Sequence, residues 1–569
     1  MGCRFAVPLL IIKERRQTDC LMKSRIPLHD YQEIAKNFLL KTEKGGLFLD
    51  VGFGKTLVTL STLEDLGMAG QLEGHILIIA PKAIARSTWI DEMDKWGIQA
   101  NIESFIVDYD PERYAREIAE WTAKMELRKK VQAIYPDPCD LKKNKGVVID
   151  GVKYPPSKFL MPKATETCAF YKNPPKMPPK DRPLTKEQRL QKYADIDNHV
   201  PSFYFINREL ICDLIDWLIA NKKPWPFPTV VIDELQSFKS YNAQRFKSMK
   251  LVMPFVKRFI GLTGTPIPNG LEDLWPEIYL MDGGKRLGKN ITAYRNRFFY
   301  PGLTIDRNVV RWDIQPGAAD VIYDLISDIV ISIKNPSLKL PPVTYNNITV
   351  YMDSDEMEVY KTLAKENVID LMADEGVATV EAVNPAILKA KLKQMASGTL
   401  YVNYDKDNGK KSSDHKYTVI HRHKLEHLEY IVNNTGSPVL VAYHFVSDQK
   451  EILSYLKAKG IDVQVFDGSP DMMAKWNRRE IPVMLLHPQS CGHGINIQKG
   501  GHTLVWYTVP DSLESYIQVN GRLNRQGQTE PVMIHHLLTA GTVDKGLLKA
   551  LDNKTAEEQA LLDAVAAVM

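Results

Sequence analysis

The sequence predicts an α/β fold with two domains, each built around a parallel sheet. Short runs of apolar and β-branched residues alternate with helical patterns in two separate blocks, as strands buried on both faces of a parallel sheet require. In the first block we expect strands at Gly46–Val51, His75–Ala80, Val230–Asp233 and Phe259–Thr263. In the second block we expect them at Val439–His444, Asp462–Phe466, Val483–His487, Thr503–Tyr507 and Val532–Leu538.

Length and composition agree with a globular protein. Of the 569 residues, 44% are hydrophobic and 25% are charged, which excludes a mainly disordered chain or a disulfide scaffold. The net charge of +4 permits an anionic partner without requiring one. The six cysteines form no CxxC pair, so we expect free thiols in a reducing compartment. An apolar run at residues 6–12 precedes its basic cluster, the reverse of a secretory signal, and we expect a cytoplasmic protein.

Helical patterns fill the spaces between the strands. Lys55–Leu66 and Ser447–Lys459 are examples, and they are followed by Gly67 and Gly460. Glycine is the residue that most often follows the last turn of a helix. We therefore expect these two helices to end at the glycines.

Two regions interrupt the alternation and suggest a division of the chain. We expect an N-terminal segment at 1–25, a first lobe at 26–285 with an insertion at about 108–200, a helical connection at 286–340 and a second lobe at 341–569. Within the insertion, residues 136–183 hold ten of the 34 prolines, and ten Lys or Arg against five Asp or Glu. Proline at this density interrupts helices and central strands, so we expect an irregular Pro/Lys-rich insertion.

A glycine turn between a strand and a helix is the first candidate site. Gly52-Phe53-Gly54-Lys55-Thr56 follows the first expected strand. Glycine lets backbone N–H groups converge on a phosphate at the positive end of a helix. In this pattern Lys55 reaches the β- and γ-phosphates, and the Thr56 hydroxyl binds Mg²⁺. The alternative is a solvated Gly-Lys turn, since Leu49 occupies the position where the full P-loop pattern has its first glycine.

Two carboxylates follow a later strand. Asp233 and Glu234 stand at the C-terminal end of an apolar run, where α/β proteins place their ligands. Asp233 would hold Mg²⁺, and Glu234 would polarise the attacking water. The alternative is the acidic first turn of a helix. Because the glycine loop and the acidic pair each follow a buried run, together they predict a site that hydrolyses a nucleoside triphosphate.

The third candidate is a basic helix near the C-terminus. Asp511 stands where an N-cap is expected, with Glu514 placed to complete a capping box. Gln518, Arg522 and Arg525 then follow at a spacing of four and three residues, which places them on one helix face. Two guanidiniums on one face can neutralise the charge that develops during phosphoryl transfer. The alternative is a solvated basic face.

These motifs, in this order, resemble those of the SNF2-like (Swi2/Snf2) translocases of helicase superfamily 2, particularly compact phage and bacterial members. The resemblance extends over most of residues 26–550, apart from the insertion. The matching segments are His29–Gln32 (Q-type motif), Gly52–Thr56 (motif I), Ala80–Lys82 with Trp89, Glu92 and Trp96 (motif Ia), Asp233–Gln236 (DEAH-type box), Leu262–Asn269 (motif III), Leu392–Gly398, Asp467–Ser469, Gly492–Gln498 (motif V) and Gln518–Gln528 (motif VI).

The resemblance implies two RecA-like lobes that bind ATP and Mg²⁺ between them. It assigns Tyr31 and Gln32 to the adenine side, and Gly494 and Asn496 to the nucleotide. It also implies that the two arginines reach the γ-phosphate from the second lobe, so that hydrolysis requires closure of the lobes. The box reads Asp-Glu-Leu-Gln, and Gln236 in its fourth position can still form a hydrogen bond between the lobes.

DNA is the partner that the resemblance implies. Contacts of both lobes with its phosphate backbone would allow the protein to move along it. The candidates are Lys82, Arg86, Thr263, Thr265, Gly468 and Ser469. Phosphate contacts of this kind carry no sequence information. For each residue a role in a turn or cap is the alternative, and we expect Trp89 and Trp96 to be core residues. The insertion, with lysines interleaved among aromatic residues, is either a DNA clamp or a solvated loop.

We therefore expect an ATP-dependent DNA translocase or helicase that moves along or remodels DNA in replication, recombination or repair. If a phage encodes it, it acts in the cytoplasm of the host. The alternatives are a strand-separating DNA or RNA helicase, the motor subunit of a restriction or nuclease system, and a nucleotide-gated clamp that hydrolyses little ATP.

Overall fold

The computed structural model describes residues 28–50, 52–82, 84–108, 111–143, 147–160, 175, 182–305, 308–333, 340–373, 376–382, 384–402, 416–490 and 495–565. The expected N-terminal segment and Gly494 lie outside these residues. The chain divides into two compact units. Residues 1–102 and 197–569 form the first unit, which contains both expected lobes, and residues 103–196 form the second.

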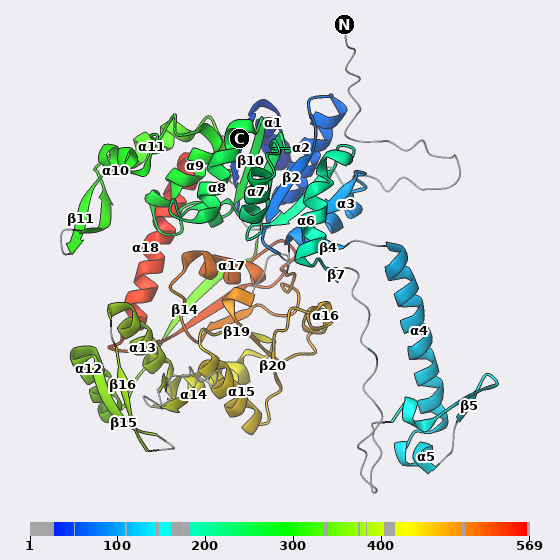
Figure 1. Cartoon of the computed structure of the whole chain (residues 1–569). Helices are drawn as coiled ribbons and strands as arrows, with labels where there is room; N and C mark the ends of the chain where they lie inside the picture. The colour runs from blue at the N-terminus through cyan, green and yellow to red at the C-terminus, as the bar shows by residue number, and fades with distance from the viewer. Residues whose placement is uncertain are drawn as a thin grey trace. The chain divides into compact units, whose positions relative to one another are not determined.

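The first lobe is built on a seven-stranded sheet with the strand order β13-β1-β10-β9-β2-β8-β3. Figure 1 labels its strands β2 and β10. From β13 to β8 all neighbours pair in parallel. The four expected strands are present with bounds shifted by up to three residues, and β8, β13 and β3 are additional. The bounds are β1 Lys44–Phe48, β2 Ile76–Ala80, β3 Ile102–Ser104, β8 Phe203–Asn207, β9 Thr229–Asp233, β10 Arg258–Thr263 and β13 Val330–Ile331.

One helix precedes the first of these strands, and each of the other helices follows one of them. They are α1 Asp30–Lys41, α2 Lys55–Met68, α3 Trp89–Trp96, α7 Ile211–Ala220, α8 Gln244–Val252 and α9 Leu274–Asp282. The expected end of α2 at Gly67 is wrong, because the helix continues to Met68 and the left-handed residue after it is Gly70, with a φ of 69°. A π-helical turn, η1 Ile84–Thr88, leads directly into α3. Short 3₁₀ turns η4 Leu235–Phe238, η5 Met253–Phe255 and η6 Leu271–Asp273 complete the lobe.

The stretch between the sheets is only partly helical. It contains α10 Ile291–Phe298 and α11 Ala318–Ile326, separated by an antiparallel hairpin of β11 Phe299–Ile305 and β12 Asn308–Ile314. The hairpin was not expected from the sequence. The next strand, β13, pairs with β1 and so belongs to the sheet of the first lobe.

The second lobe has a six-stranded, fully parallel sheet with the order β14-β23-β22-β19-β21-β20. All five expected strands are present, and the structure adds β14 at the edge. The bounds are β14 Val343–Val350, β19 Val439–Ala442, β20 Val463–Val465, β21 Val483–Leu486, β22 Thr503–Trp506 and β23 Val532–Thr539. Side chains alternate along β19, with Leu440 in the core on one face and Val441 in the core on the other. The two parallel sheets confirm the predicted two-lobe α/β fold.

Two helices of the second lobe, α15 Val446–Ala458 and α17 Leu513–Leu523, were expected from the sequence. The helix α15 ends as expected, since Gly460 follows its cap in a left-handed conformation. The others are α12 Ser354–Glu366, α13 Pro385–Ser397, α14 His423–Thr435, α16 Pro470–Asn477, η7 Pro488–Ser490 and α18 Val543–Ala564. The antiparallel pairs β15 Val368–Ala373 with β16 Gly376–Glu381, and β17 Thr399–Tyr401 with β18 Tyr417–Val419, complete this lobe.

The final helix, α18, and the residue after it form hydrogen bonds with both lobes. Near its start, Asp544 accepts a hydrogen bond from Lys424 of the second lobe at 2.7 Å. Further along, Glu557 accepts one from the backbone N–H of Leu271 in the first lobe at 3.3 Å. After the helix ends, the Val565 carbonyl accepts from the N–H of Ser332 at 3.1 Å. Among the described residues, no helix is both long enough and apolar enough to cross a membrane.

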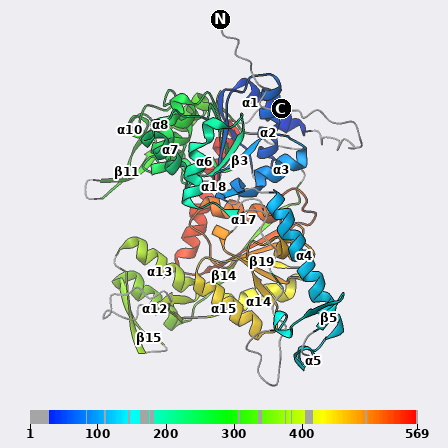
Figure 2. The ribbon, with the colours of Figure 1, turned by 45° about the vertical axis from the view of Figure 1, so that its right-hand side comes forward.

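The second unit contains a folded module, so the expectation of a wholly irregular insertion is wrong. The helix α4 Pro111–Ile134 precedes the proline-dense stretch, which explains how it can extend over 24 residues. At its end lie α5 Pro138–Lys143, the hairpin of β5 Val147–Ile149 and β6 Val152–Tyr154, and η2 Pro156–Lys158, visible in Figures 1 and 2. The unit also includes β4 Val107–Asp108, β7 Arg182–Pro183 and α6 Lys186–Ala194, and the 3₁₀ turn η3 Ile196–Asn198 begins at its last residue.

A separate small core holds the end of α4 together with the hairpin. It is formed by Val131, Leu141, Val147, Ile149, Phe159 and Leu160. We call residues 128–160 the head.

The predicted domain limits at 26, 285, 340 and 569 stay a prediction.

Candidate nucleotide-binding site

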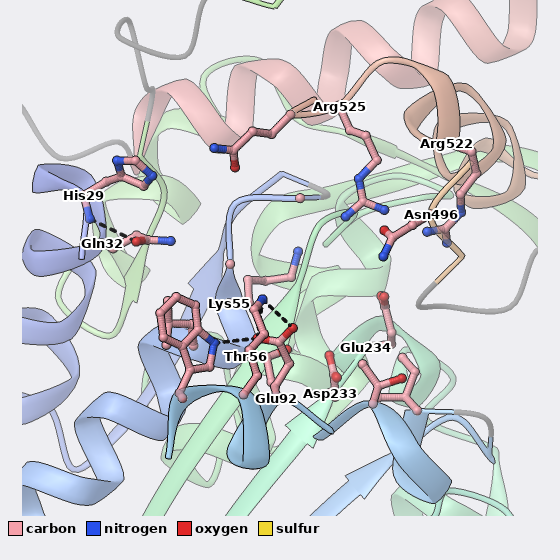
Figure 3. Close-up of a pocket in the computed structure, with 18 of the residues that line it drawn as sticks. His29, Gln32, Lys55, Thr56, Glu92, Asp233, Glu234, Asn496, Arg522 and Arg525 are labelled. Carbon is pink, nitrogen blue, oxygen red and sulfur yellow. Dashed lines mark hydrogen bonds and ion pairs between the residues drawn. The ribbon is translucent and has the colours of Figure 1, made fainter. Parts of the chain in front are cut away.

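A cavity of about 470 Å³ is lined by residues from both lobes. Figure 3 shows Arg522, Arg525 and Asn496 facing Lys55, Asp233 and Glu234 across it. The first lobe contributes His29, Gln32, Gly52, Gly54, Lys55, Thr56, Leu57, Ile84, Thr88, Glu92, Lys95, Trp96, Asp233 and Glu234, and the second contributes Asn496, Gln518, Arg522, Arg525 and Gln526. Most of the residues expected to contact the nucleotide are therefore brought together.

The glycine turn has the backbone that a phosphate cradle needs. Gly52 and Gly54 have φ angles of 90° and 73°, in the left-handed region that favours glycine. A Cβ added to Gly54 would lie 2.4 Å from Nε2 of Gln32, so a side chain at this position would have to displace the Gln32 amide. The ammonium of Lys55 donates to the carbonyls of Leu49 at 2.7 Å and Asp50 at 3.2 Å. The lysine is thus held at the end of the first strand, beside the turn.

The Q-type segment supports this turn. The Gln32 amide donates to the Phe53 carbonyl at 3.2 Å, and its Oε1 accepts the backbone N–H of His29 at 3.0 Å. Tyr31 was expected on the adenine side, but it is buried and packs edge-on against the Phe53 ring, with centroids 5.4 Å apart. It does not line the cavity. In this structure Gln32 faces the site and Tyr31 holds the turn from behind.

The acidic pair lies at the C-terminal end of β9, as the sequence predicts. Asp233 is buried, and its Oδ2 accepts the indole N–H of Trp89 at 2.9 Å. Glu234 has a φ of 59°, a left-handed conformation that costs free energy for any residue except glycine and that is concentrated at functional sites. This turn directs the Glu234 side chain to the cavity, where the Gln236 amide donates to its Oε2.

The two arginines reach the cavity from different local structures, and the expectation of one shared helix face is wrong. Arg522 lies in α17, but the helix ends at Leu523, so Arg525 lies beyond it. There Arg525 donates to the Ile495 carbonyl at 3.2 Å. A Cβ added to Gly52 would lie 3.9 Å from Nε of Arg525, which places this guanidinium beside the phosphate turn. Burial and the charge of Arg522 lower the pKa of Arg525, so the two cations together favour an anion between them.

The start of α17 differs from the expected capping box. Its N-cap is Ser512, whose hydroxyl accepts the N–H of Ser515 at 3.2 Å. Asp511 instead pairs with Lys389 at 2.6 Å and Lys393 at 2.7 Å. Burial favours the neutral carboxyl, but the two lysines outweigh it and lower the pKa of Asp511 to about 2. Glu514 therefore does not complete a capping box at this end of the helix. It accepts hydrogen bonds from Gln518 and from Gln236 of the first lobe.

The residues expected to contact nucleic acid lie outside the cavity lining. Lys82 and Gly468 are exposed, Arg86 is partly exposed, and Ser469 is the N-cap of α16. Thr263 and Thr265 are buried, and the Thr263 hydroxyl accepts the N–H of Thr265. In this structure those two hydroxyls are not at the surface, and their contact with DNA stays a prediction.

Sequence reasoning missed the role of the segment after β2. Ile84, Thr88, Glu92, Lys95 and Trp96 line the cavity, although contact with nucleic acid was expected from Lys82 and Arg86 of this region. The expectation that Trp96 is a core residue is wrong, because it is only partly buried and lines the cavity. The Trp96 indole donates to Glu92 at 2.7 Å. The repeat of polar and aromatic residues every three or four positions was the available signal, since it puts them on one helix face.

The donors of the cavity fit a nucleoside triphosphate with a hard cation. The glycine turn, Lys55 and the two arginines supply N–H donors and positive charge for phosphates. The Thr56 hydroxyl and the Asp233 carboxylate are oxygen ligands of the type that Mg²⁺ prefers. No sulfur or imidazole group among the lining residues competes with them except His29, which lies beside Gln32.

Comparison with protein families gives two matches. The SNF2-related domain matches residues 31–153 and 218–398, more than half of the chain. The helicase conserved C-terminal domain matches residues 423–527, which include Arg522 and Arg525.

Individual relatives agree. Putative protein p41 of Acyrthosiphon pisum secondary endosymbiont phage 1 is 29% identical over 563 residues, covering 96% of this chain and 99% of that protein. Protein CHROMATIN REMODELING 5 of Arabidopsis thaliana is 22% identical over 548 residues, or 93% of this chain and 26% of that protein. Putative ATP-dependent helicase/translocase YwqA of Bacillus subtilis is 22% identical over 343 residues, or 57% of this chain and 34% of that protein. The chain thus spans about a quarter to a third of these two longer relatives.

Among solved structures, the Sulfolobus solfataricus SWI2/SNF2 ATPase core in complex with dsDNA is similar, with a TM-score of 0.36 and 17% identity over 96% of this chain and 98% of that one. The family matches alone are sufficient for an assignment. The chain belongs to the SNF2-related family and carries both the SNF2-related domain and the helicase C-terminal domain.

Proposed function

We propose that this protein is a DNA-dependent ATPase that uses ATP and Mg²⁺ to move along duplex DNA. The observation that carries the proposal is the cavity between the lobes, where Lys55, Asp233 and Glu234 of one lobe face Arg522 and Arg525 of the other. A site divided in this way is complete only while the lobes are together. Hydrolysis and product release would then let the lobes separate, and repeated cycles would produce steps.

Each residue has a distinct role in this proposal. Lys55 and the turn at Gly52 and Gly54 bind the phosphates. Thr56 and Asp233 hold Mg²⁺, which when bound neutralises the charge on the phosphate oxygens. Glu234 accepts a hydrogen bond from the attacking water and orients it. The arginines stabilise the charge that develops on the γ-phosphate. Gln518 and Asn496 line the cavity from the second lobe, whereas the contact of Gly494 with the nucleotide stays a prediction.

DNA is proposed as the partner because the chain belongs to the SNF2-related family and because one relative is named a helicase/translocase. On the first lobe, Lys82 and Arg86 follow β2 and are accessible to a phosphate backbone. On the second lobe, the exposed Gly468 and the neighbouring Ser469 are candidates. These groups contact phosphates without reading bases.

The head is a further candidate for DNA contact. Its 33 residues carry eight Lys or Arg and three Asp, a net charge of +5, whereas the whole chain carries +4. Two of the three aspartates are paired with lysines, Asp150 with Lys130 at 2.5 Å and Asp140 with Lys143 at 3.2 Å. The net positive charge of a folded module supports a clamp on nucleic acid better than the alternative of a solvated loop.

ATP turnover measured in parallel with single-stranded DNA, duplex DNA, forks and RNA tests the proposal. Duplex DNA is expected to stimulate turnover most. Displacement of a third strand from a triplex, without unwinding of a duplex that has an overhang, would indicate translocation on duplex DNA. Stimulation by RNA alone, or unwinding without triplex displacement, would favour a strand-separating helicase. No turnover with any nucleic acid would contradict the motor.

A further inference from the structure

The indole of Trp89 is bonded to the carboxylate that the proposed function assigns to the metal. Nε1 of Trp89 lies 2.9 Å from Oδ2 of Asp233, and the bond is buried. Trp89 has 0% exposure and Asp233 has 7%. Indole N–H is a donor only, so this bond requires an acceptor such as the ionised carboxylate. A bond from a neutral donor to an ionised acceptor is about twice as strong as one between neutral groups.

The position of Trp89 connects the carboxylate to a different part of the first lobe. Trp89 is the first residue of α3, and the π-helical turn Ile84–Thr88 leads into it without a break, since Thr88 has right-handed helical angles. This turn follows β2, which pairs in parallel with β9, the strand that ends at Asp233. Lys82 and Arg86, which are candidates for contact with DNA, lie in the same segment between β2 and α3. A π-helical turn of this kind is uncommon and is often found at functional sites.

Geometry limits what the bond can do. With Oδ2 held by the indole, the carboxylate of Asp233 cannot rotate about its last torsion without losing a buried hydrogen bond. Residues that hold a metal ligand in this way set its orientation, and their loss typically lowers metal affinity by about 10- to 100-fold. Trp89 is too deeply buried to touch the nucleotide or the cation, and it does not line the cavity.

We infer that Trp89 is a positioning residue for Asp233, and that it joins the segment bearing Lys82 and Arg86 to the metal site. The inference rests on the proposed nucleotide site. A change in the π-helical turn on DNA contact would shift the indole and, with it, the carboxylate. DNA would then act on the affinity for the metal as well as on closure of the lobes.

The test uses the full chain with Trp89→Phe, which keeps a buried aromatic ring but removes the N–H together with the five-membered part of the indole. Trp275→Phe is the matched control, because Trp275 is also buried in the first lobe and its indole donates to the Gly288 carbonyl at 2.9 Å, with no link to a carboxylate. Asp233→Asn sets the scale for loss of the ligand. If Trp89→Phe does not bind ADP in the absence of metal, Trp89→Leu repeats the test.

Three quantities are measured: binding of ADP without metal, binding of Mn²⁺ to the ADP complex by electron paramagnetic resonance, and the Mg²⁺ concentration for half-maximal ATP turnover with and without duplex DNA. We expect Trp89→Phe to bind ADP without metal like the wild type. It should bind Mn²⁺ about 10-fold more weakly and need correspondingly more Mg²⁺. Its stimulation by DNA should fall, while Trp275→Phe retains wild-type values.

Wild-type Mn²⁺ affinity in Trp89→Phe would overturn the positioning role, and so would an equal loss in Trp275→Phe. Weakened Mn²⁺ binding with undiminished stimulation by DNA would overturn the link to the Lys82–Arg86 segment. Failure of the proposed function has a different signature, because a wild type that binds Mn²⁺ and ADP but never responds to DNA would contradict the motor and leave the Mn²⁺ comparison readable.

Discussion

The side-chain amide of Gln236 in the first lobe donates a hydrogen bond to Oε1 of Glu514 in the second lobe, at 3.4 Å. The same amide donates to Glu234, and Lys239 lies 3.7 Å from Oε2 of Glu514. A single glutamine therefore contacts both the proposed water-orienting carboxylate and the helix that carries Arg522. The fourth position of the acidic box thus forms the hydrogen bond between the lobes that the sequence suggested.

Replacing Glu514 with Ala should remove the hydrogen bond between the lobes and leave ATP binding nearly unchanged. A hydrogen bond to a charged group contributes roughly 1.5–3 kcal/mol at most, and this one is long, so we expect turnover stimulated by DNA to fall about 3- to 10-fold. ATP affinity should stay within about 2-fold of wild type, since Glu514 is not in the cavity lining. Steady-state turnover and nucleotide binding measure the two effects. A stimulated rate equal to that of wild type would contradict the coupling role.

Lys55→Ala and Glu234→Gln should fail at different steps. Lys55 is placed to bind phosphates, so its loss should abolish nucleotide binding or hydrolysis. Glu234→Gln keeps the shape of the side chain and its hydrogen bond from Gln236, but it removes the charge that polarises water. We expect this variant to bind ATP and not turn it over. Binding of a fluorescent nucleotide, followed by single-turnover hydrolysis, separates the steps, and rapid turnover by Glu234→Gln would refute the assignment.

Removing residues 136–183, which include most of the head, should weaken binding to DNA and reduce its dependence on salt. Each phosphate contact that is lost lowers the slope of log affinity against log salt by about 0.9 for duplex DNA. We expect deletion of residues 136–183 to flatten the slope, and Lys153→Gln with Lys158→Gln to flatten it less. Turnover without DNA should not change. Unaltered affinity and slope in both variants would show that residues 136–183 do not contact DNA.

Glu558 should make the folded protein less stable as the pH rises. Glu558 is 3% exposed, and neither oxygen of its carboxylate has a hydrogen-bond partner among the described residues. Burial raises the pKa of Glu558 to about 8. The negative charges of Asp50, Glu514 and Asp273 act in the same direction, and the positive charge of Lys239 opposes them. The folded state therefore holds a proton that the unfolded state has lost, and this contribution disappears as pH rises through about 8.

We expect Glu558→Gln, which is always neutral, to have the stability of the wild type near pH 5 and to unfold at least about 2 °C higher at pH 9. Glu277, whose pKa is also raised by burial, faces Glu558 and leaves some dependence on pH in the variant. Thermal unfolding across this range measures the difference. Parallel curves for the two proteins would contradict the assignment of the proton to Glu558.

The sequence was sufficient for the two sheets and for most of the cavity because buried parallel strands are short apolar runs with motifs at their ends. Strand β14 was missed because its side chains are mostly exposed, so it lacks the continuous apolar run of a buried strand. The head was missed because proline density describes only residues 136–183, whereas its core also uses Val131 from the preceding helix.

Errors within the site have local causes. The sequence could not show that Lys389 and Lys393 would take Asp511 away from the helix end, because these residues are more than a hundred positions apart. The same is true of Trp89, which appears as an ordinary core residue until its partner Asp233, 144 positions away, is known. Pairings across such distances depend on tertiary structure and leave no periodic signal in the chain.

The most direct test of a nucleotide held between two lobes is the rate of ATP hydrolysis, with and without duplex DNA, in the wild type and in Arg522→Ala and Arg525→Ala. We expect the wild type to be strongly stimulated by DNA. Both variants should bind DNA as the wild type does and lose the stimulation, because the positive charge on the second lobe completes the site. If either variant retained stimulation at the wild-type level, that arginine would not act on the nucleotide, and if both did, the account of a site shared by the lobes would be wrong.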